Sequence, residues 1–185
     1  MPRRSLRILV FLLVLPALWS PPVSAGEMLE PGMPFPAFSL PAHDGTVVSS
    51  ADLAGKWVLV YFYPKADTPG CTREACELRD SWPEVQAEGL VVLGVSYDTP
   101  EANRAFAEKY HLPFLLLSDR DRELAAQVGA KRALIPVPRR ISYLVAPDGT
   151  VARAYAQVDP ATHAGEVLRD LRRLKAEATP EASKG

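Results

Sequence analysis

The two cysteines of the chain, Cys71 and Cys76, stand five residues apart in the stretch Tyr61-Phe-Tyr-Pro-Lys-Ala-Asp-Thr-Pro-Gly-Cys-Thr-Arg-Glu-Ala-Cys76. Five residues of a regular α-helix separate two Cα atoms by roughly 8 to 9 Å, whereas a disulfide needs less than about 7 Å. The thiols can therefore be bridged only if the helix locally unwinds. This spacing favours a redox switch between a folded dithiol and a locally unfolded disulfide. The alternative is a plain structural disulfide of an exported protein.

Cys71 is the more reactive thiol in this prediction because of where the helix begins. Thr68 is a favourable N-cap and Pro69 suits the first helical position, and a residue before proline is kept out of the α region. Cys71 then lies in the first turn, where unpaired N–H groups and the positive end of the helix dipole favour a thiolate. Cys76 lies a turn deeper and gains less. The thiolate is the form that attacks an electrophile such as a peroxide oxygen.

The first 25 residues are typical of a secretory signal. A basic start (Arg3, Arg4 and Arg7) precedes an apolar core over 8–19 and the small-residue site Val23-Ser24-Ala25. The apolar run is too short to span a bilayer. We expect cleavage after Ala25, export to a bacterial periplasm or out of the cell, and no membrane attachment afterwards.

The mature chain would be a single domain over 26–178, followed by a disordered tail over 179–185. Removing the three arginines of the signal leaves 18 basic against 22 acidic residues, a formal charge of −4. No basic patch for nucleic acid is expected. The oxidising compartment lets a cysteine pair persist as a disulfide without making it inert.

Alternating apolar runs and helical segments predict an α/β chain. The runs Trp57–Tyr63 and Leu90–Val95 are typical of central strands buried on both faces, and Asp148-Gly149 indicates a β-hairpin. Further strands are expected over 38–40, 47–48, 114–117, 141–145 and 151–155, and helices over 71–88, 101–110 and 122–128, with a closing amphipathic helix that contains Val167, Leu168, Leu171 and Leu174. This order predicts a thioredoxin-like fold, a central mixed β-sheet flanked by α-helices.

The residues around Cys71 resemble the peroxiredoxin family. Pro64, Thr68 and Cys71 match its P-x-x-x-[TS]-x-x-C signature, and the run P-K-A-D-T-P-G-C-T-x-E-A-C is similar to the bacterioferritin-comigratory, or Q-type, subgroup. The resemblance extends more loosely over roughly 30 to 175. It implies that Cys71 is the peroxidatic nucleophile and that Cys76 is the resolving thiol, which forms a disulfide with it. It also implies that the hydroxyl of Thr68 and a distant arginine hold the peroxide and the thiolate.

The family's arginine stands in an R-x-[ST]-[FY] pattern, which Arg140-Ile-Ser-Tyr143 matches, and Arg139 is its rival. Successive residues of a strand point to opposite faces, so only one of the two arginines can point toward the active site. We expect it to be Arg140. A guanidinium there would stabilise the thiolate and the charge that develops on the leaving oxygen.

Several of these residues also have purely structural explanations. Glu74 either orients Arg140 through a charge-assisted hydrogen bond or is a solvated acid on the helix face. Thr68 could serve only as a helix cap, and Pro64 only as the end of a strand. The histidines at 43, 111 and 163 are scattered, so we expect no metal site and no cofactor.

Three classes of function are compatible with this sequence. The full motif favours a thiol peroxidase that reduces hydrogen peroxide and organic hydroperoxides and is recycled by a thioredoxin-like donor. A thiol–disulfide oxidoreductase usually carries C-x-x-C instead, and a non-catalytic thioredoxin-like module is the third class. The resemblance implies a monomer or weak dimer. The proline-rich segment Lys131–Pro138 departs from the subgroup pattern, and peroxide access and partner binding both stay open as its role.

Overall fold

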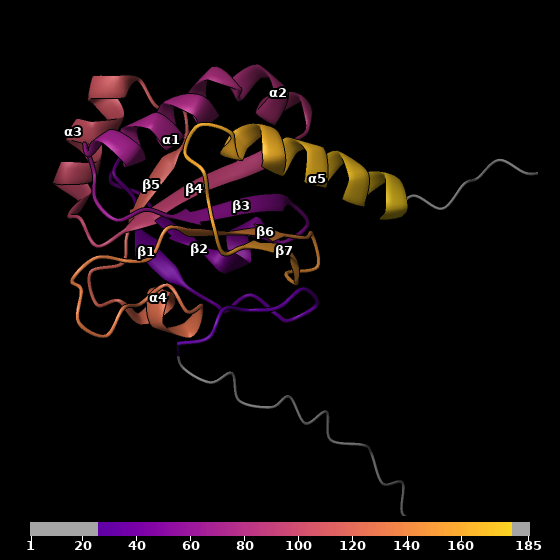
Figure 1. Ribbon diagram of the computed structural model, residues 1–185, viewed down its shortest axis with the longest axis horizontal. Coiled ribbons are helices and arrows are strands. Elements are labelled where there is room, and N and C mark those ends of the chain that lie inside the picture. The colour runs from indigo at the N-terminus through magenta and orange to yellow at the C-terminus, as the bar shows by residue number, and fades with distance from the viewer. Residues whose placement is uncertain (1–25, 179–185) are drawn as a thin grey trace, which may run out of the picture.

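A computed structural model describes residues 26–178 and centres on a five-stranded mixed sheet (Figure 1). Its strands are β3 (Trp57–Phe62), β4 (Leu90–Ser96), β5 (Leu115–Ser118), β6 (Ile141–Val145) and β7 (Val151–Tyr155), in the order β5-β4-β3-β6-β7. β3 pairs in parallel with β4, and β4 with β5, whereas β6 runs antiparallel to β3 and β7 antiparallel to β6. This mixed sheet with flanking helices confirms the predicted thioredoxin-like fold.

Both faces of the sheet are covered, which explains why its central strands are apolar along their whole length. One face carries the helices α1 (Pro69–Asp80), α2 (Trp82–Ala87), α3 (Pro100–Tyr110) and α5 (His163–Ala178) (Figure 1). The other face carries α4 (Glu123–Gln127) and the hairpin of β1 (Ser39–Pro41) and β2 (Val47–Ser49). A 3₁₀ turn at Ser50–Leu53 follows this hairpin. Alternate residues of β3 enter two separate cores. Leu59 and Tyr61 pack under α1 and α5, and Val58, Val60 and Phe62 pack on the other face.

The single helix predicted over 71–88 is wrong, because α1 ends at Asp80 and α2 begins at Trp82. Pro83 lies in the first turn of α2. A proline within a continuous helix would lack its N–H donor and would collide with the carbonyl four residues earlier. α1 therefore ends one turn after Cys76 and is short. The other predicted strands and helices with stated bounds are present, with ends displaced by one residue or none.

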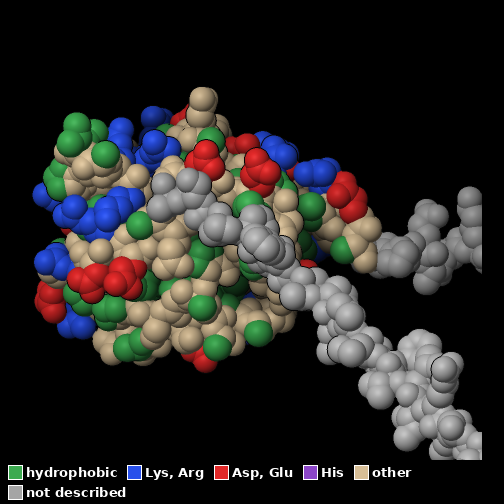
Figure 2. All heavy atoms as spheres, turned by 90° about the horizontal axis from the view of Figure 1, so that it is seen from below, with side chains coloured by type: hydrophobic (Ala, Val, Ile, Leu, Met, Phe, Trp, Pro, Cys, Tyr) green, Lys and Arg blue, Asp and Glu red, His purple; other side chains and the backbone are tan. Residues whose placement is uncertain are grey.

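The closing helix α5 packs as its pattern predicts, since Val167, Leu168 and Leu171 are buried and Leu174 is partly buried against the same core. Within residues 26–178, the helices are all too short or too polar to cross a bilayer. The face seen from below carries basic and acidic side chains close to one another (Figure 2). The predicted signal over 1–25 and the tail over 179–185 lie outside the described residues.

Candidate active site

The pairing of β3 with β6 brings the motif and the predicted arginine together. In this antiparallel pair Phe62, the last residue of β3, lies opposite Ile141, the first residue of β6. Residues that follow β3 therefore lie beside the residue that precedes β6. The chain leaves β3, passes through Pro64 and enters α1, so Arg140 is adjacent to the first turn of that helix.

Cys71 is the third residue of α1 and is buried, with 2% of its surface exposed. Thr68 has the extended backbone of an N-cap, and its carbonyl accepts a hydrogen bond of 2.8 Å from the N–H of Thr72. Cys71 thus lies in the first turn, as predicted. Cys76 is partly exposed, and both thiols are free within the intact helix. In this fold the cysteines are not a structural disulfide.

Arg140 contacts Cys71 and Glu74 at the same time. Its Nη2 donates a hydrogen bond of 3.3 Å to the Cys71 Sγ, and its Nη1 donates to Oε2 of Glu74. Gly70 leaves room for the guanidinium, since a Cβ at that position would lie 3.2 Å from Nη2. Strand alternation therefore predicted the correct arginine. Arg139 is exposed, and both hydrogen bonds to the site come from its neighbour.

Glu74 is completely buried, so its interpretation as a solvated acid is wrong. Burial raises the pKa of Glu74 to about 7, while the charge and hydrogen bond of Arg140 act in the opposite direction. Its Oε1 has no hydrogen-bond partner among the described residues. The carboxyl group orients the guanidinium from the side away from solvent, which is the positioning arrangement predicted from sequence.

Thr68 and Pro64 belong to the loop that joins β3 to α1. The Thr68 hydroxyl donates a hydrogen bond of 2.9 Å to the Lys65 carbonyl and does not cap α1. Thr68 is thus the N-cap residue of α1, as predicted, but its hydroxyl holds the preceding loop and does not accept a hydrogen bond from the first turn. Pro64 is half-buried two residues after β3 and lines a hollow together with Arg132, Pro138, Arg139 and Arg140.

The proline-rich segment Lys131–Pro138 lies beside the same hollow as Pro64. Arg132 and Pro138, near its two ends, line the hollow that Arg140 reaches. Between them, Leu134 projects with 95% of its surface exposed, and Ile135 is 43% exposed. The segment is therefore a neighbour of the active site and presents apolar side chains to solvent.

Sequence reasoning missed a buried polar pair on the same side of the sheet as Arg140. His163 opens α5, is fully buried, and has its Nε2 2.9 Å from the Ser142 Oγ. Burial, and to a lesser degree the charge of Arg140, lower the pKa of His163 to about 4, which leaves the ring neutral at pH 7. The residue that could have indicated this pair from the sequence was Ser142, because it shares a strand face with Arg140.

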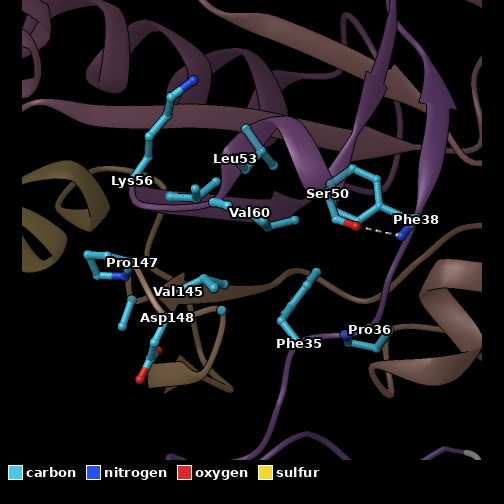
Figure 3. A pocket seen from close by; sticks show the side chains of 14 residues that line it. Phe35, Pro36, Phe38, Ser50, Leu53, Lys56, Val60, Val145, Pro147 and Asp148 are labelled. Atoms are coloured by element: carbon cyan, nitrogen blue, oxygen red, sulfur yellow. Dashed lines mark hydrogen bonds between the residues drawn. The ribbon is translucent and has the colours of Figure 1, made fainter.

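A second hollow, of 140 Å³, lies on the opposite face of the sheet from α1 (Figure 3). Phe35, Phe38 and Val60 line it, with Lys56 and Asp148 among the few charged groups. The hydroxyl of Ser50 accepts a hydrogen bond of 3.2 Å from the N–H of Phe38. Its lining contains neither a cysteine nor a histidine, whereas both cysteines of the chain lie on α1.

The family model of the AhpC/TSA family matches residues 31–154. The chain therefore belongs to the AhpC/TSA family. Peroxiredoxin Bcp of Escherichia coli strain K12 is 41% identical to it over 157 residues, which are 82% of this chain and 97% of that protein.

Solved structures of similar proteins point to the same family. Peroxidoxin BcpB from Mycobacterium tuberculosis superposes with a TM-score of 0.74 at 33% identity, over 79% of this chain and 98% of that one. A bacterioferritin comigratory protein of Xanthomonas campestris superposes with a TM-score of 0.73 at 31% identity, over 81% of this chain and 100% of that one. Within its family the chain is a peroxiredoxin of the Bcp, or Q, type, and hence a thiol peroxidase, as its motif predicted.

Proposed function

We propose that this chain reduces hydrogen peroxide and organic hydroperoxides through Cys71 and Cys76. The observation that carries the proposal is the guanidinium of Arg140, which donates to the Cys71 Sγ within the first turn of α1. A positive charge and unpaired helix N–H groups both favour a thiolate over a thiol. The bacterioferritin comigratory protein of Xanthomonas campestris has an alkyl peroxide reduction activity, which supports organic hydroperoxides as substrates here.

In the first step the Cys71 thiolate attacks the terminal oxygen of the hydroperoxide. An S–O bond forms as the O–O bond breaks, and the leaving oxygen takes a proton to become water or an alcohol. Cys71 is left as a sulfenic acid. Arg140 stabilises the negative charge as it moves from sulfur to the leaving oxygen, and Glu74 holds Arg140 in position. Pro64 lines the hollow that Arg140 reaches, and the family resemblance assigns the Thr68 hydroxyl to the peroxide.

In the second step Cys76 attacks the sulfenic sulfur and expels water, which leaves a Cys71–Cys76 disulfide. The residues between the two must first unwind, because an intact helix keeps their Cα atoms too far apart. Cys76 is partly exposed and is therefore less constrained by packing than Cys71. A thioredoxin-like dithiol donor then supplies two electrons through thiol–disulfide exchange and restores both thiols.

The test is mass spectrometry of the reduced protein before and after one equivalent of hydrogen peroxide, followed by a stopped-flow peroxidase assay with a dithiol donor. We expect one intramolecular disulfide after oxidation and loss of peroxide turnover in Cys71→Ser. In Cys76→Ser, dimedone should label Cys71. A protein that keeps both thiols reduced under peroxide would contradict the proposal.

We further propose that the chain is exported, with cleavage after Ala25, and acts as a monomer or weak dimer reduced by a thioredoxin-like protein of that compartment. The resolving thiol stands in the same chain as the nucleophile, so a second subunit is not required for the cycle. The mass of the mature protein tests the cleavage site. Sedimentation of the reduced and oxidised forms tests the oligomeric state.

A further inference from the structure

The loop that leads into α1 is tied to the end of α3 by a compact polar contact. The Asp67 carboxylate accepts hydrogen bonds of 2.9 and 2.7 Å from Lys109 Nζ and one of 2.6 Å from the Tyr110 hydroxyl. Asp67 also has a left-handed backbone with φ of 57°, a conformation that aspartate and asparagine tolerate better than most residues. The contact therefore holds the chain four residues before Cys71 in a specific conformation.

Tyr110 reaches both ends of α1. Its hydroxyl binds Asp67 just before the helix, and its carbonyl accepts a hydrogen bond of 2.8 Å from Nη1 of Arg79 in the last turn. The residues that must unwind for disulfide formation, 71–76, lie between these two attachments. The end of α3 therefore acts as a brace along the helix that carries both cysteines.

We propose that Asp67, Lys109 and Tyr110 form a clamp that keeps α1 wound and thereby sets the rate at which Cys76 captures the oxidised Cys71. The proposal rests on the function proposed above. The closed clamp keeps Cys71 beside Arg140, where it meets peroxide. The open clamp frees the start of α1, so that the sulfur of Cys71 can leave Arg140 and meet Cys76.

The exposure of the clamp suits a contact that opens in every catalytic cycle. Lys109 and Asp67 are 57% and 45% exposed, so water and salt weaken their attraction. The pair of Arg140 with the buried Glu74 is protected from solvent and is costly to break. The start of α1 can therefore detach at Asp67 while the arginine stays in its place at the sheet.

The clamp also controls a competition between two fates of the sulfenic acid. A second peroxide converts it to a sulfinic acid, whereas unwinding lets Cys76 form the disulfide. A weaker clamp should speed unwinding far more than it slows the first oxidation of Cys71, since Arg140 and Glu74 still hold the thiolate in the wound helix. Weakening the clamp should therefore protect the enzyme against overoxidation.

The test compares Asp67→Asn, Lys109→Met and Tyr110→Phe with the unaltered protein. Asparagine tolerates the left-handed backbone but removes the charge, and phenylalanine keeps the ring of Tyr110 while removing its hydroxyl. Arg173→Met is the matched control, because Arg173 pairs with Glu177 at similar exposure on α5. Acid quench at millisecond times after one equivalent of hydrogen peroxide, followed by mass spectrometry, measures the sulfenic acid and the disulfide separately.

We expect the disulfide to form about two- to fivefold faster in all three clamp variants and at the parental rate in Arg173→Met. Raising the salt concentration should accelerate this step in the parent but not in Lys109→Met, a difference that a merely structural role would not produce. Equal disulfide rates in the parent, Asp67→Asn and Tyr110→Phe would overturn the clamp. If the parent's Cys71 is not oxidised by peroxide at all, the proposed function fails instead.

Discussion

The two thiols of α1 lie in different surroundings. At the first turn Cys71 is buried, contacts Arg140, and is followed one turn later by the buried Glu74. Toward the last turn Cys76 is partly exposed, and Arg79 pairs with the exposed carboxylate of Asp80. One helix thus combines a buried reactive centre with a partner thiol that is partly exposed.

This difference shows how one short helix serves two steps with conflicting demands. Attack on peroxide needs a fixed thiolate beside a fixed positive charge, because preorganised charges stabilise a transition state best. Disulfide formation needs the same helix to unwind, which is easier where solvent-exposed contacts hold the chain, as at Asp67. Pro83 contributes by ending α1 soon after Cys76, so only a short helix has to open.

Removing the more exposed thiol, Cys76, should have the largest effect on turnover. In Cys76→Ser we expect the first oxidation of Cys71 to keep its rate while steady turnover with a dithiol donor falls sharply, because no intramolecular disulfide can form and the donor must attack the buried sulfenic acid directly. Stopped-flow traces of the first and later turnovers separate the two. Slow oxidation of Cys71 in this variant would mean that Cys76 also belongs to the reactive centre.

In the buried surroundings of Cys71, Arg140→Lys should lower kcat/KM for hydrogen peroxide by about 10²-fold. A lysine keeps the positive charge but cannot donate in two fixed directions to Cys71 and Glu74 at once. Arg139→Lys is the matched control, since Arg139 is exposed and both hydrogen bonds to the site come from Arg140, so kcat/KM should stay unchanged. Equal losses in both variants would mean that the two fixed hydrogen bonds of Arg140 are not what supports the rate.

Glu74→Gln should lower kcat/KM less than Arg140→Lys, by about tenfold. Glutamine can still accept a hydrogen bond from Arg140, but the bond no longer joins two charged groups. The rate of disulfide formation in a single turnover should change little, because Cys76 is not among the groups that Glu74 contacts. A larger change in that rate than in kcat/KM would place Glu74 in the unwinding step.

The smallest expected effect concerns stability and the buried His163. Its folded pKa of about 4 lies below the ordinary value of 6.5, so the folded protein binds fewer protons than the unfolded chain between these values. The stability it contributes is complete above pH 6.5 and is lost as the pH falls through 4. Urea unfolding of His163→Gln at pH 7 and pH 4.5 should show a decline smaller than the parent's by about 1 to 3 kcal/mol. An identical decline would contradict the assignment.

The motif and the strand pattern were predictable from local sequence. Helix-capping rules place Cys71 in the first turn, and alternation along a strand separates Arg140 from Arg139. The break at Ser81 was also readable from Pro83, although the apolar pattern led to one continuous helix. These properties depend on a few neighbouring residues, which is why a single sequence contains them.

The sequence by itself determined the order of the elements and the place of Cys71 in the first turn of a helix, because both follow from hydrophobic period and from the geometry of a helix start. Only the tertiary structure decided that Glu74 is buried and that Tyr110 reaches both ends of α1. The physical reason is distance along the chain. Burial and long-range hydrogen bonds depend on which segments pack together, and no local pattern around Glu74 specifies that Arg140, far along the chain, will cover it.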